Sequence, residues 1–230
     1  MLVGDTDSLN AHDYQSNQNS IQVTQSIFGI TLINARSLVN KLPELHFLQY
    51  DKTYGSHDCI CITESWLHAD LLDGLLDPLS NYDIFRNDRQ YSRGGGVCVF
   101  VRREFKALQI YVSGAPAGAD IVCFELTHCA VHVRLFVVYR PPSISDATTL
   151  CLGTTAGDIM SQLIRCLESN MNSAGPTIIV GDWNCPNIDW ELMMPPSEQC
   201  QKLLYDFVVF NGMRQFVHEP TRKTIFSTSS

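Results

Sequence analysis

Residues 177–184 read Thr-Ile-Ile-Val-Gly-Asp-Trp-Asn, an apolar run that stops abruptly at an acid and an amide. The run predicts a buried strand over residues 177–182, as in the centre of α/β folds. Residues 58–64, Asp-Cys-Ile-Cys-Ile-Thr-Glu, repeat the pattern and end at Glu64. Residues 28–34 form a third run, which ends at Asn34. The three runs predict an α/β core with polar groups at its strand ends.

The rest of the chain alternates between short apolar runs and amphipathic segments. Further strands are predicted over residues 82–88, 95–102, 105–112, 121–126, 130–140 and 213–218. Helices are predicted over residues 43–54, 158–170 and 197–210, with Ser197 as the cap of the last helix, and residues 71–79 as a loop or short helix. Hairpin-spaced strands and strand–helix–strand stretches both occur, so mixed sheets are expected. No internal repeat or flexible linker divides residues 27–230, which predicts one domain.

The composition is that of an ordinary globular protein, with 45% hydrophobic and 17% charged residues among 230. It excludes collagen-like, coiled-coil, small disulfide-stapled and wholly disordered classes. Residues 1–26 are rich in Asn, Gln, Ser, Asp and Thr, and we expect a disordered leader there. No apolar run approaches about 18 residues and no signal peptide is visible, so neither a membrane partner nor secretion is expected.

The net charge of −8 argues against a basic coat that binds DNA or membranes non-specifically. It does not exclude a nucleic-acid enzyme, because such enzymes gather carboxylates around metal ions. Residues 86–106 are locally basic, with six Lys or Arg against two acids. A solvated face is the favoured interpretation of this basic stretch, and contacts with phosphate are the alternative.

The nine cysteines are scattered and include no Cys-x-x-Cys pair. Zinc ribbons and thioredoxin-like chemistry are therefore not expected. Most of the cysteines stand within apolar runs, which favours reduced, buried thiols in an intracellular protein, in the nucleus or the cytoplasm.

The polar strand ends are the candidate site. A single acid after a strand is usually a cap or a turn residue. Three such ends in one chain favour a functional site, because strand ends are where α/β proteins gather catalytic groups. Carboxylate and amide oxygens suit Mg²⁺ or Mn²⁺ rather than zinc.

Six short motifs follow one another along the chain: INARSL (33–38), ITESWL (62–67), RGGGV (93–97), VYRPPS (138–143), GDWN (181–184) and PTR (220–222). Together they resemble the endonuclease/exonuclease/phosphatase superfamily over residues 28–222. Within it, the chain looks most like the apurinic-type endonuclease domain of non-LTR retrotransposons of the CR1- or jockey-like kind.

This resemblance implies a four-layered sandwich of two mixed β-sheets flanked by helices, as in DNase I-like folds. It implies Mg²⁺-dependent hydrolysis of a DNA phosphodiester, with Mn²⁺ as an alternative ion. In elements of this kind the activity nicks target DNA to prime reverse transcription. DNA is then the partner, and the resemblance allows a reverse transcriptase domain in the intact polyprotein.

The resemblance also assigns roles residue by residue. Glu64 matches the metal-binding glutamate, with Asn34 beside it. Asp182 matches the acid that orients or deprotonates the attacking water, and Asn184 and Tyr139 match residues that contact the phosphate. Such chemistry needs a carboxylate to activate water and neutral donors to hold the phosphate.

Arg36, Arg140 and Thr221 are the candidate substrate-binding residues. Each candidate also has a structural alternative. Arg140 could pair with an acid and Arg36 could cap a carbonyl. Tyr139 could be a core tyrosine and Asn184 a turn residue.

One departure from the family matters. The family ends with a Ser-Asp-His segment, and no Asp-His dipeptide occurs in this chain. We therefore expect the domain to be incomplete at its C-terminus, with the last strands missing, and its nicking to be weak or absent. One alternative is a catalytically inactive remnant that at most binds nucleic acid or a partner. Another is a phosphatase or lipid phosphodiesterase on the same fold.

Overall fold

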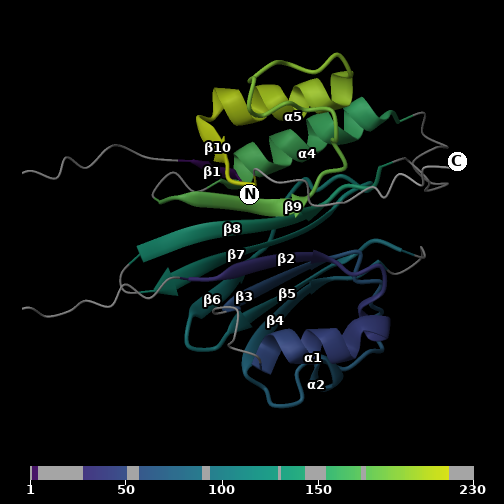
Figure 1. Ribbon diagram of the computed structural model, residues 1–230, viewed down its shortest axis with the longest axis vertical. Helices are drawn as coiled ribbons and strands as arrows, with labels where there is room; N and C mark the ends of the chain where they lie inside the picture. The colour runs from purple at the N-terminus through teal and green to yellow at the C-terminus, as the bar shows by residue number, and fades with distance from the viewer. Residues whose placement is uncertain are drawn as a thin grey trace, which may run out of the picture.

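The computed structural model describes residues 2–4, 28–50, 57–89, 94–128, 131–142, 154–171 and 175–217. These residues form a six-stranded and a four-stranded β-sheet, with helices on the outer face of each (Figure 1). This confirms the predicted α/β sandwich of two mixed sheets flanked by helices. The expectation that the last strands are missing stays a prediction, because residues 218–230 lie outside the described ranges.

The smaller sheet has the strand order β2-β3-β5-β4. Its strands are β2 (Ile30–Asn34), β3 (Cys59–Thr63), β5 (Val97–Arg102) and β4 (Tyr82–Asn87). β2 and β3 are parallel, whereas β5 pairs antiparallel with both β3 and β4. β3 is buried along its whole length, as its uninterrupted apolar sequence predicts.

The larger sheet has the order β10-β1-β9-β8-β7-β6. Its strands are β10 (Met213–Gln215), β1 (Leu2–Gly4), β9 (Thr177–Asp182), β8 (Val131–Tyr139), β7 (Asp120–His128) and β6 (Lys106–Ile110). β8 and β9 are parallel, and all other neighbours in this sheet are antiparallel. The parallel pair brings Tyr139 and Asp182 opposite each other at its end.

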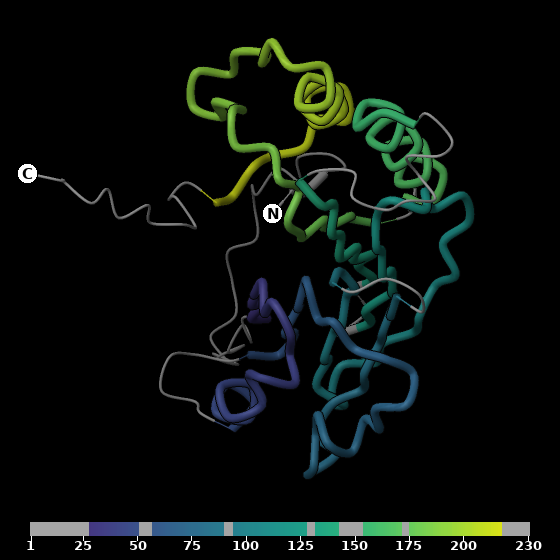
Figure 2. The backbone as a smooth tube through the Cα atoms, turned by 90° about the vertical axis from the view of Figure 1, so that its right-hand side faces the viewer, coloured from purple at the N-terminus to yellow at the C-terminus, as the bar shows by residue number. Residues whose placement is uncertain are grey.

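Helices cover the two outer faces. A short 3₁₀ turn (Leu38–Lys41), α1 (Leu42–Tyr50) and α2 (Asp73–Leu76) lie over the smaller sheet. α4 (Ala156–Asn170) and α5 (Gln199–Phe210) lie over the larger one. Figure 2 shows α4 and α5 nearly end on at one extreme of the molecule and α1 at the opposite one. The apolar stripe predicted for residues 158–170 is buried, and Thr155 and Asp158 form a capping box at the start of α4.

Alternation along the strands separates three apolar layers. Cys59 and Cys61 of β3 face the larger sheet and pack with Phe124 and Val137. Ile60 of the same strand faces the helices of the smaller sheet. Together with the core under α4 and α5, these layers make the four-layered arrangement of helices, sheet, sheet and helices.

Several sequence expectations differ from the structure, most of them at the ends of elements. Ser197 is not a cap, because α5 begins at Gln199 after Glu198. The last strand ends at Gln215 instead of residue 218, since the Gln215 Oε1 atom accepts hydrogen bonds from the next two backbone amides. Within the expected leader, Leu2–Gly4 forms strand β1 between β9 and β10. Residues 5–27 lie outside the described ranges.

The described cysteines form no disulfide with one another, and all of them except Cys185 are buried, whereas the reduced state stays a prediction. No helix in the described part of the chain has the length and apolar character to cross a membrane.

Candidate active site

Asn34 joins the ends of three strands that belong to two different sheets. β2 ends at Asn34, Glu64 follows β3, and Asp182 ends β9. The Asn34 Nδ2 atom donates to Glu64 Oε1 at 2.7 Å and to Asp182 Oδ2 at 2.9 Å. The three polar side chains that the sequence predicts as a site are therefore in contact where the ends of the two sheets meet.

The other side of the Asn34 amide is unused. Asn34 Oδ1 is buried and has no hydrogen-bond partner among the described residues. A buried acceptor without a donor costs free energy, so such an atom usually has a further partner. Two carboxylates and an unused amide oxygen are a hard-oxygen donor set, which fits Mg²⁺ or Mn²⁺. No group of three or more His, Cys, Asp or Glu that could hold a metal occurs in the described ranges, so an ion here would depend on this set.

Tyr139 stands beside the two carboxylates and is 5% exposed. Burial raises the pKa of its phenol to about 12, and the negative charges of Glu64 and Asp182 add to the shift. The Arg89 guanidinium, 5.9 Å from the ring centre, acts in the opposite direction. The Tyr139 hydroxyl is therefore protonated at neutral pH and can donate a hydrogen bond.

Arg140 is held inside the protein and does not face solvent. It is 4% exposed, and its Nε atom donates to Trp183 O at 2.9 Å while Nη2 donates to Asn184 O at 3.0 Å. In return, Asn184 Nδ2 donates to Arg140 O at 2.8 Å. Arg140 therefore holds the loop after β9, and its role in binding substrate stays a prediction.

The same loop fixes the orientation of Asp182. The Asn184 backbone N–H donates to Asp182 Oδ1 at 3.2 Å, while Asp182 Oδ2 accepts from Asn34. Both carboxylate oxygens therefore have a donor that fixes their direction. Asn184 is partly buried, and its contact with the phosphate stays a prediction.

The two remaining substrate-binding candidates, Arg36 and Thr221, have no described side-chain contact with the site. Arg36 is exposed, in the turn that follows β2, and the next residue, Ser37, donates its N–H to Glu64 O at 3.0 Å. The turn therefore lies against the site, with the Arg36 side chain in solvent. Thr221 lies outside the described residues.

Backbone strain gathers at these strand ends. Positive φ angles at non-glycine residues are uncommon and tend to occur at functional sites. Seven such residues occur in the described ranges, and five of them follow the strands that carry the site: Arg36 (46°), Ser37 (92°), Glu64 (51°), Trp66 (52°) and Asn184 (49°). The fold thus tolerates a strained backbone where it places the polar groups.

Sequence reasoning missed a pair that supports the site. Arg89 Nε contacts both carboxylate oxygens of Asp120 at 2.9 Å, and Asp120 Oδ2 also accepts from the Gly96 amide at 2.9 Å. This pair holds the guanidinium near the Tyr139 ring. The signal was the basic stretch at 86–106, but periodicity does not show which arginine meets which acid.

Most of that basic stretch is neutralised within the fold. The ion pairs are Arg86 with Asp73 and Asp88, Arg89 with Asp120, Arg102 with Asp58, and Arg103 with Asp83. The favoured interpretation of a solvated face is therefore incomplete, because several of these arginines are structural. The arrangement gives no support to the alternative of phosphate contacts.

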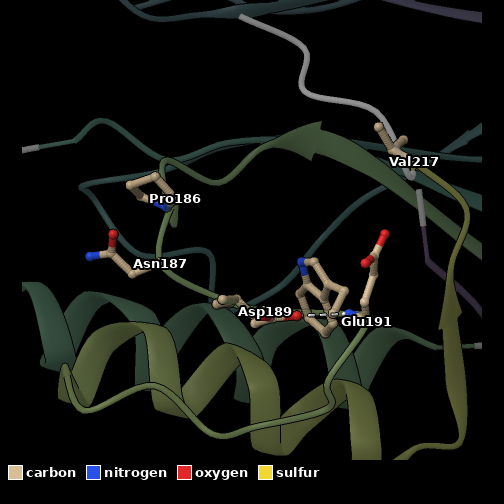
Figure 3. Close-up of a pocket in the computed structure, with 7 residues that line it drawn as sticks. Pro186, Asn187, Asp189, Glu191 and Val217 are labelled. Carbon is tan, nitrogen blue, oxygen red and sulfur yellow. Dashed lines mark hydrogen bonds between the residues drawn. The ribbon is translucent and has the colours of Figure 1, made fainter.

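A cavity of about 430 Å³ is lined by the loop that begins two residues after Asn184 and by Val217, and it includes none of the predicted residues. Figure 3 shows Pro186 and Asn187 at one end of it and Glu191 and Val217 at the other. Trp190 also lines it and stacks on Tyr205, with ring centres 6.2 Å apart.

Comparison with known proteins places the fold. The model of the endonuclease/exonuclease/phosphatase family matches residues 32–224. Among solved structures, the chain is similar to the endonuclease domain of TRAS1, a telomere-specific non-LTR retrotransposon (TM-score 0.50, 14% identity, 79% of this chain and 69% of that one). It is also similar to the 3′ phosphatase NExo from Neisseria, bound to a product DNA hairpin (TM-score 0.53, 14% identity, 79% and 69%).

A third similar structure is an AP endonuclease from Archaeoglobus fulgidus (TM-score 0.50, 11% identity, 78% of this chain and 68% of that one). Identities this low show a shared fold and nothing finer. No curated protein sequence matches the chain.

Proposed function

Because the chain belongs to the endonuclease/exonuclease/phosphatase family, we propose that it hydrolyses phosphodiester bonds in DNA with Mg²⁺, as the target-site nicking endonuclease of a retroelement. The observation that carries the proposal is the Asn34 amide, which joins Glu64 and Asp182 across two sheets. The likeness of the fold to nuclease structures supports it, as does the order of motifs along the chain. The proposal places the protein inside the cell, with access to DNA, and allows a reverse transcriptase as its partner.

Glu64 and Asn34 are the residues that would hold the divalent ion. Glu64 supplies a carboxylate, and Asn34 supplies the buried Oδ1 atom that has no partner among the described residues. When bound, the ion would polarise a phosphoryl oxygen. The carboxylate of Glu64 is already directed by its hydrogen bond from Asn34 Nδ2.

Asp182 is the residue that we propose to act on water. Its carboxylate is fixed by Asn34 on one oxygen and by the Asn184 amide on the other. A fixed carboxylate can orient a water molecule and accept its proton as the oxygen attacks phosphorus. This needs Asp182 in its ionised form.

Tyr139 and Asn184 are proposed to contact the phosphate. Tyr139 keeps its proton at neutral pH, because burial and the two carboxylates raise its pKa to about 12. A neutral donor can stabilise the charge that develops on the phosphoryl oxygens without adding a second base. Arg140 acts indirectly, since it holds the carbonyls of Trp183 and Asn184 and so positions the loop.

The test is nicking of supercoiled plasmid in Mg²⁺ by the full chain and by two variants, Glu64→Gln and Asp182→Asn. Each variant keeps the size of the side chain and removes its charge. We expect weak nicking by the parent chain and a further loss, to the background of the assay, in each variant. The matched controls are Glu104→Gln and Asp206→Asn, two exposed acids on other surfaces, which should nick like the parent chain.

Nicking that persists in both site variants would sink the proposal. Absence of nicking by the parent chain, with retained DNA binding, would favour the inactive remnant. Release of phosphate from a 3′-phosphorylated oligonucleotide, or cleavage of a lipid phosphodiester, without nicking would favour the other chemistries of the family.

A further inference from the structure

The loop between β9 and α5 presents three consecutive large apolar side chains to solvent. Leu192, Met193 and Met194 are 68%, 51% and 60% exposed. They come directly after Glu191, which lies at one end of the cavity described above (Figure 3). Neighbouring apolar side chains that stay in water cost free energy, and such groups mark surfaces that bind a partner.

Hydrogen bonds hold the backbone of this loop. Asp189 Oδ1 accepts from the backbone N–H groups two and three residues later, at 3.1 Å and 2.9 Å. A backbone bridge joins Asp189 to Met194, and the Tyr205 hydroxyl of α5 donates to Met193 O at 2.6 Å. The apolar side chains therefore project from an ordered backbone, which reduces the entropy lost when a partner binds.

The cavity beside these side chains has apolar walls. Ile188 is buried in it, and Trp190 and Val217 line it as well. The stack of Trp190 on Tyr205 holds the indole ring in place. A cavity of about 430 Å³ has room for a large apolar side chain, which is the kind of anchor that protein interfaces use.

The charges around this surface are negative. Asp189, Glu191 and Glu198 are exposed, and none of their carboxylates is in an ion pair within the described ranges. No Lys or Arg occurs between Arg165 and Lys202. Because Lys and Arg are what attract a phosphate backbone, the surface disfavours DNA. Apolar side chains flanked by acids fit a basic amphipathic helix instead.

A second group of exposed apolar side chains lacks this pattern of charge. Its members are Leu72, Leu75 and Leu79. Two of the three acids in residues 70–79 are not available to a partner. Asp73 is paired with Arg86, and Asp77 is buried. This second group is an internal control.

We propose that Leu192, Met193 and Met194, with the adjoining cavity, dock a basic amphipathic helix of a partner protein. An apolar side chain of the helix would enter the cavity, and its Lys or Arg residues would meet Glu191 and the neighbouring acids. Methionine side chains are flexible and adapt to the shape of the helix that they contact. The docking does not rest on the proposed function, because none of these residues takes part in it.

The experiment titrates the full chain with a synthetic helical peptide of about 18 residues, in which Leu forms one stripe and Lys the opposite face. Binding is followed by calorimetry and by the emission of Trp190. One control peptide has the same composition without the stripe, and the other has Glu in place of Lys. We expect saturable one-to-one binding of the first peptide alone, with an affinity that falls as salt is added.

Four variants locate the binding. Met193→Gln and Glu191→Gln should each raise the Kd of the peptide several-fold, since one removes an apolar contact and the other a charge. The matched controls, Leu79→Gln and Glu104→Gln, change an exposed leucine and an exposed acid elsewhere, and they should bind like the parent chain. Trp190→Phe should lose most of the change in emission. Thermal melts show that each variant is folded.

Several results would overturn the proposal. They include no binding by the parent chain, equal binding of the control peptides, and a Kd in Met193→Gln that equals that of the parent. A lower affinity of Met193→Gln for DNA, with unchanged peptide binding, would assign the surface to DNA. A dimer of the parent chain that Met193→Gln abolishes, without any peptide binding, would assign it to a second copy of the chain.

Discussion

Asn34 is the residue on which the arrangement of both carboxylates depends. A single amide group supplies one N–H to Glu64 and one to Asp182, and its oxygen is left for a further partner. Either carboxylate alone would not indicate a functional site, since an acid after a strand is common. The Asn34 amide bonds to both carboxylates and so holds them together as one set of oxygen ligands.

Asn34→Ala removes both hydrogen bonds and leaves two carboxylates facing each other. We expect the free energy of unfolding at pH 7 to fall by about 1–3 kcal/mol. Mg²⁺ should restore part of the loss, because a cation can neutralise the two charges. Urea denaturation with and without Mg²⁺ measures both effects. The control is Asn40→Ala, an exposed asparagine that bonds only to Ser37 in the described structure, and equal behaviour of the two variants would contradict the prediction.

Tyr139 makes the free energy of unfolding depend on pH in the alkaline range. Its pKa is raised from 10.0 to about 12, mainly by burial. The unfolded chain therefore loses this proton at lower pH than the folded one, so the stabilisation is complete below about pH 10 and is lost as pH rises toward 12. Tyr139→Phe should make the fall in stability over this range shallower, as followed by denaturation at a series of pH values.

Tyr82, at the far side of the smaller sheet, is the comparison. Burial also raises its pKa to about 12, and its hydroxyl donates to two backbone carbonyls away from the site. Tyr82→Phe should flatten the same part of the profile, and the double variant should flatten it further. A Tyr139→Phe profile that follows the parent chain would contradict the assignment.

Among the secondary-structure elements, the parallel strands β8 and β9 bring two of the proposed site residues together. Tyr139 and Asp182 are partners in its register, and Val138 and Gly181 are the pair before them. A Cβ atom on Gly181 would lie 2.1 Å from the Val138 carbonyl oxygen. The glycine before the acid is therefore required by the close approach of two backbones.

Gly181→Ala should separate β8 from β9, because a clash with backbone cannot be relieved by turning a side chain. We expect a loss of about 3 kcal/mol or more in the free energy of unfolding, measured in urea. Gly74→Ala is the control, since its Cβ meets nothing within 4 Å in α2, and it should be neutral or slightly stabilising. Equal stability of the two variants would show that the strands can move apart freely.

At the scale of the whole molecule, the site belongs to neither sheet. Asn34 and Glu64 come from the smaller sheet and Asp182 from the larger one, so the packing between the sheets sets their spacing. Phe85 and Phe124 stack across this interface, with ring centres 5.3 Å apart. The apolar layer between the sheets thus positions the polar groups at its end.

Phe124→Ala should cost about 3–5 kcal/mol of stability, because Phe124 is fully buried in this layer. It should also reduce nicking in the fraction that stays folded, since the two halves of the site are less firmly spaced. Denaturation and the plasmid assay measure the two effects. Phe124→Leu should be milder in both. Phe47→Ala, on a 59% exposed residue of α1, should change neither, and a similar loss there would argue against a specific role for the interface.

Much of the fold follows from local pattern. Continuous apolar runs predict the central strands, and the predicted span of β9 is confirmed at both ends. Amphipathic spacing predicts α4 and α5. The ends of elements are less well predicted, as Ser197 and β10 show, because a single side chain such as that of Gln215 can end a strand. Strand β1 was not predicted, since three residues carry too little periodicity.

Apolar runs along the chain predict an α/β core with polar residues at three strand ends, because periodicity is a local property, and the family resemblance of the motifs implies the two-sheet sandwich. Which of those polar residues meet is visible in the folded chain alone. Asn34 and Asp182 are 148 positions apart, and their hydrogen bond depends on how two sheets pack. Packing likewise turned Arg140 inward and joined Arg89 to Asp120. The types of residue are fixed along the chain, whereas distances between sheets exist only once the apolar layer between them has formed.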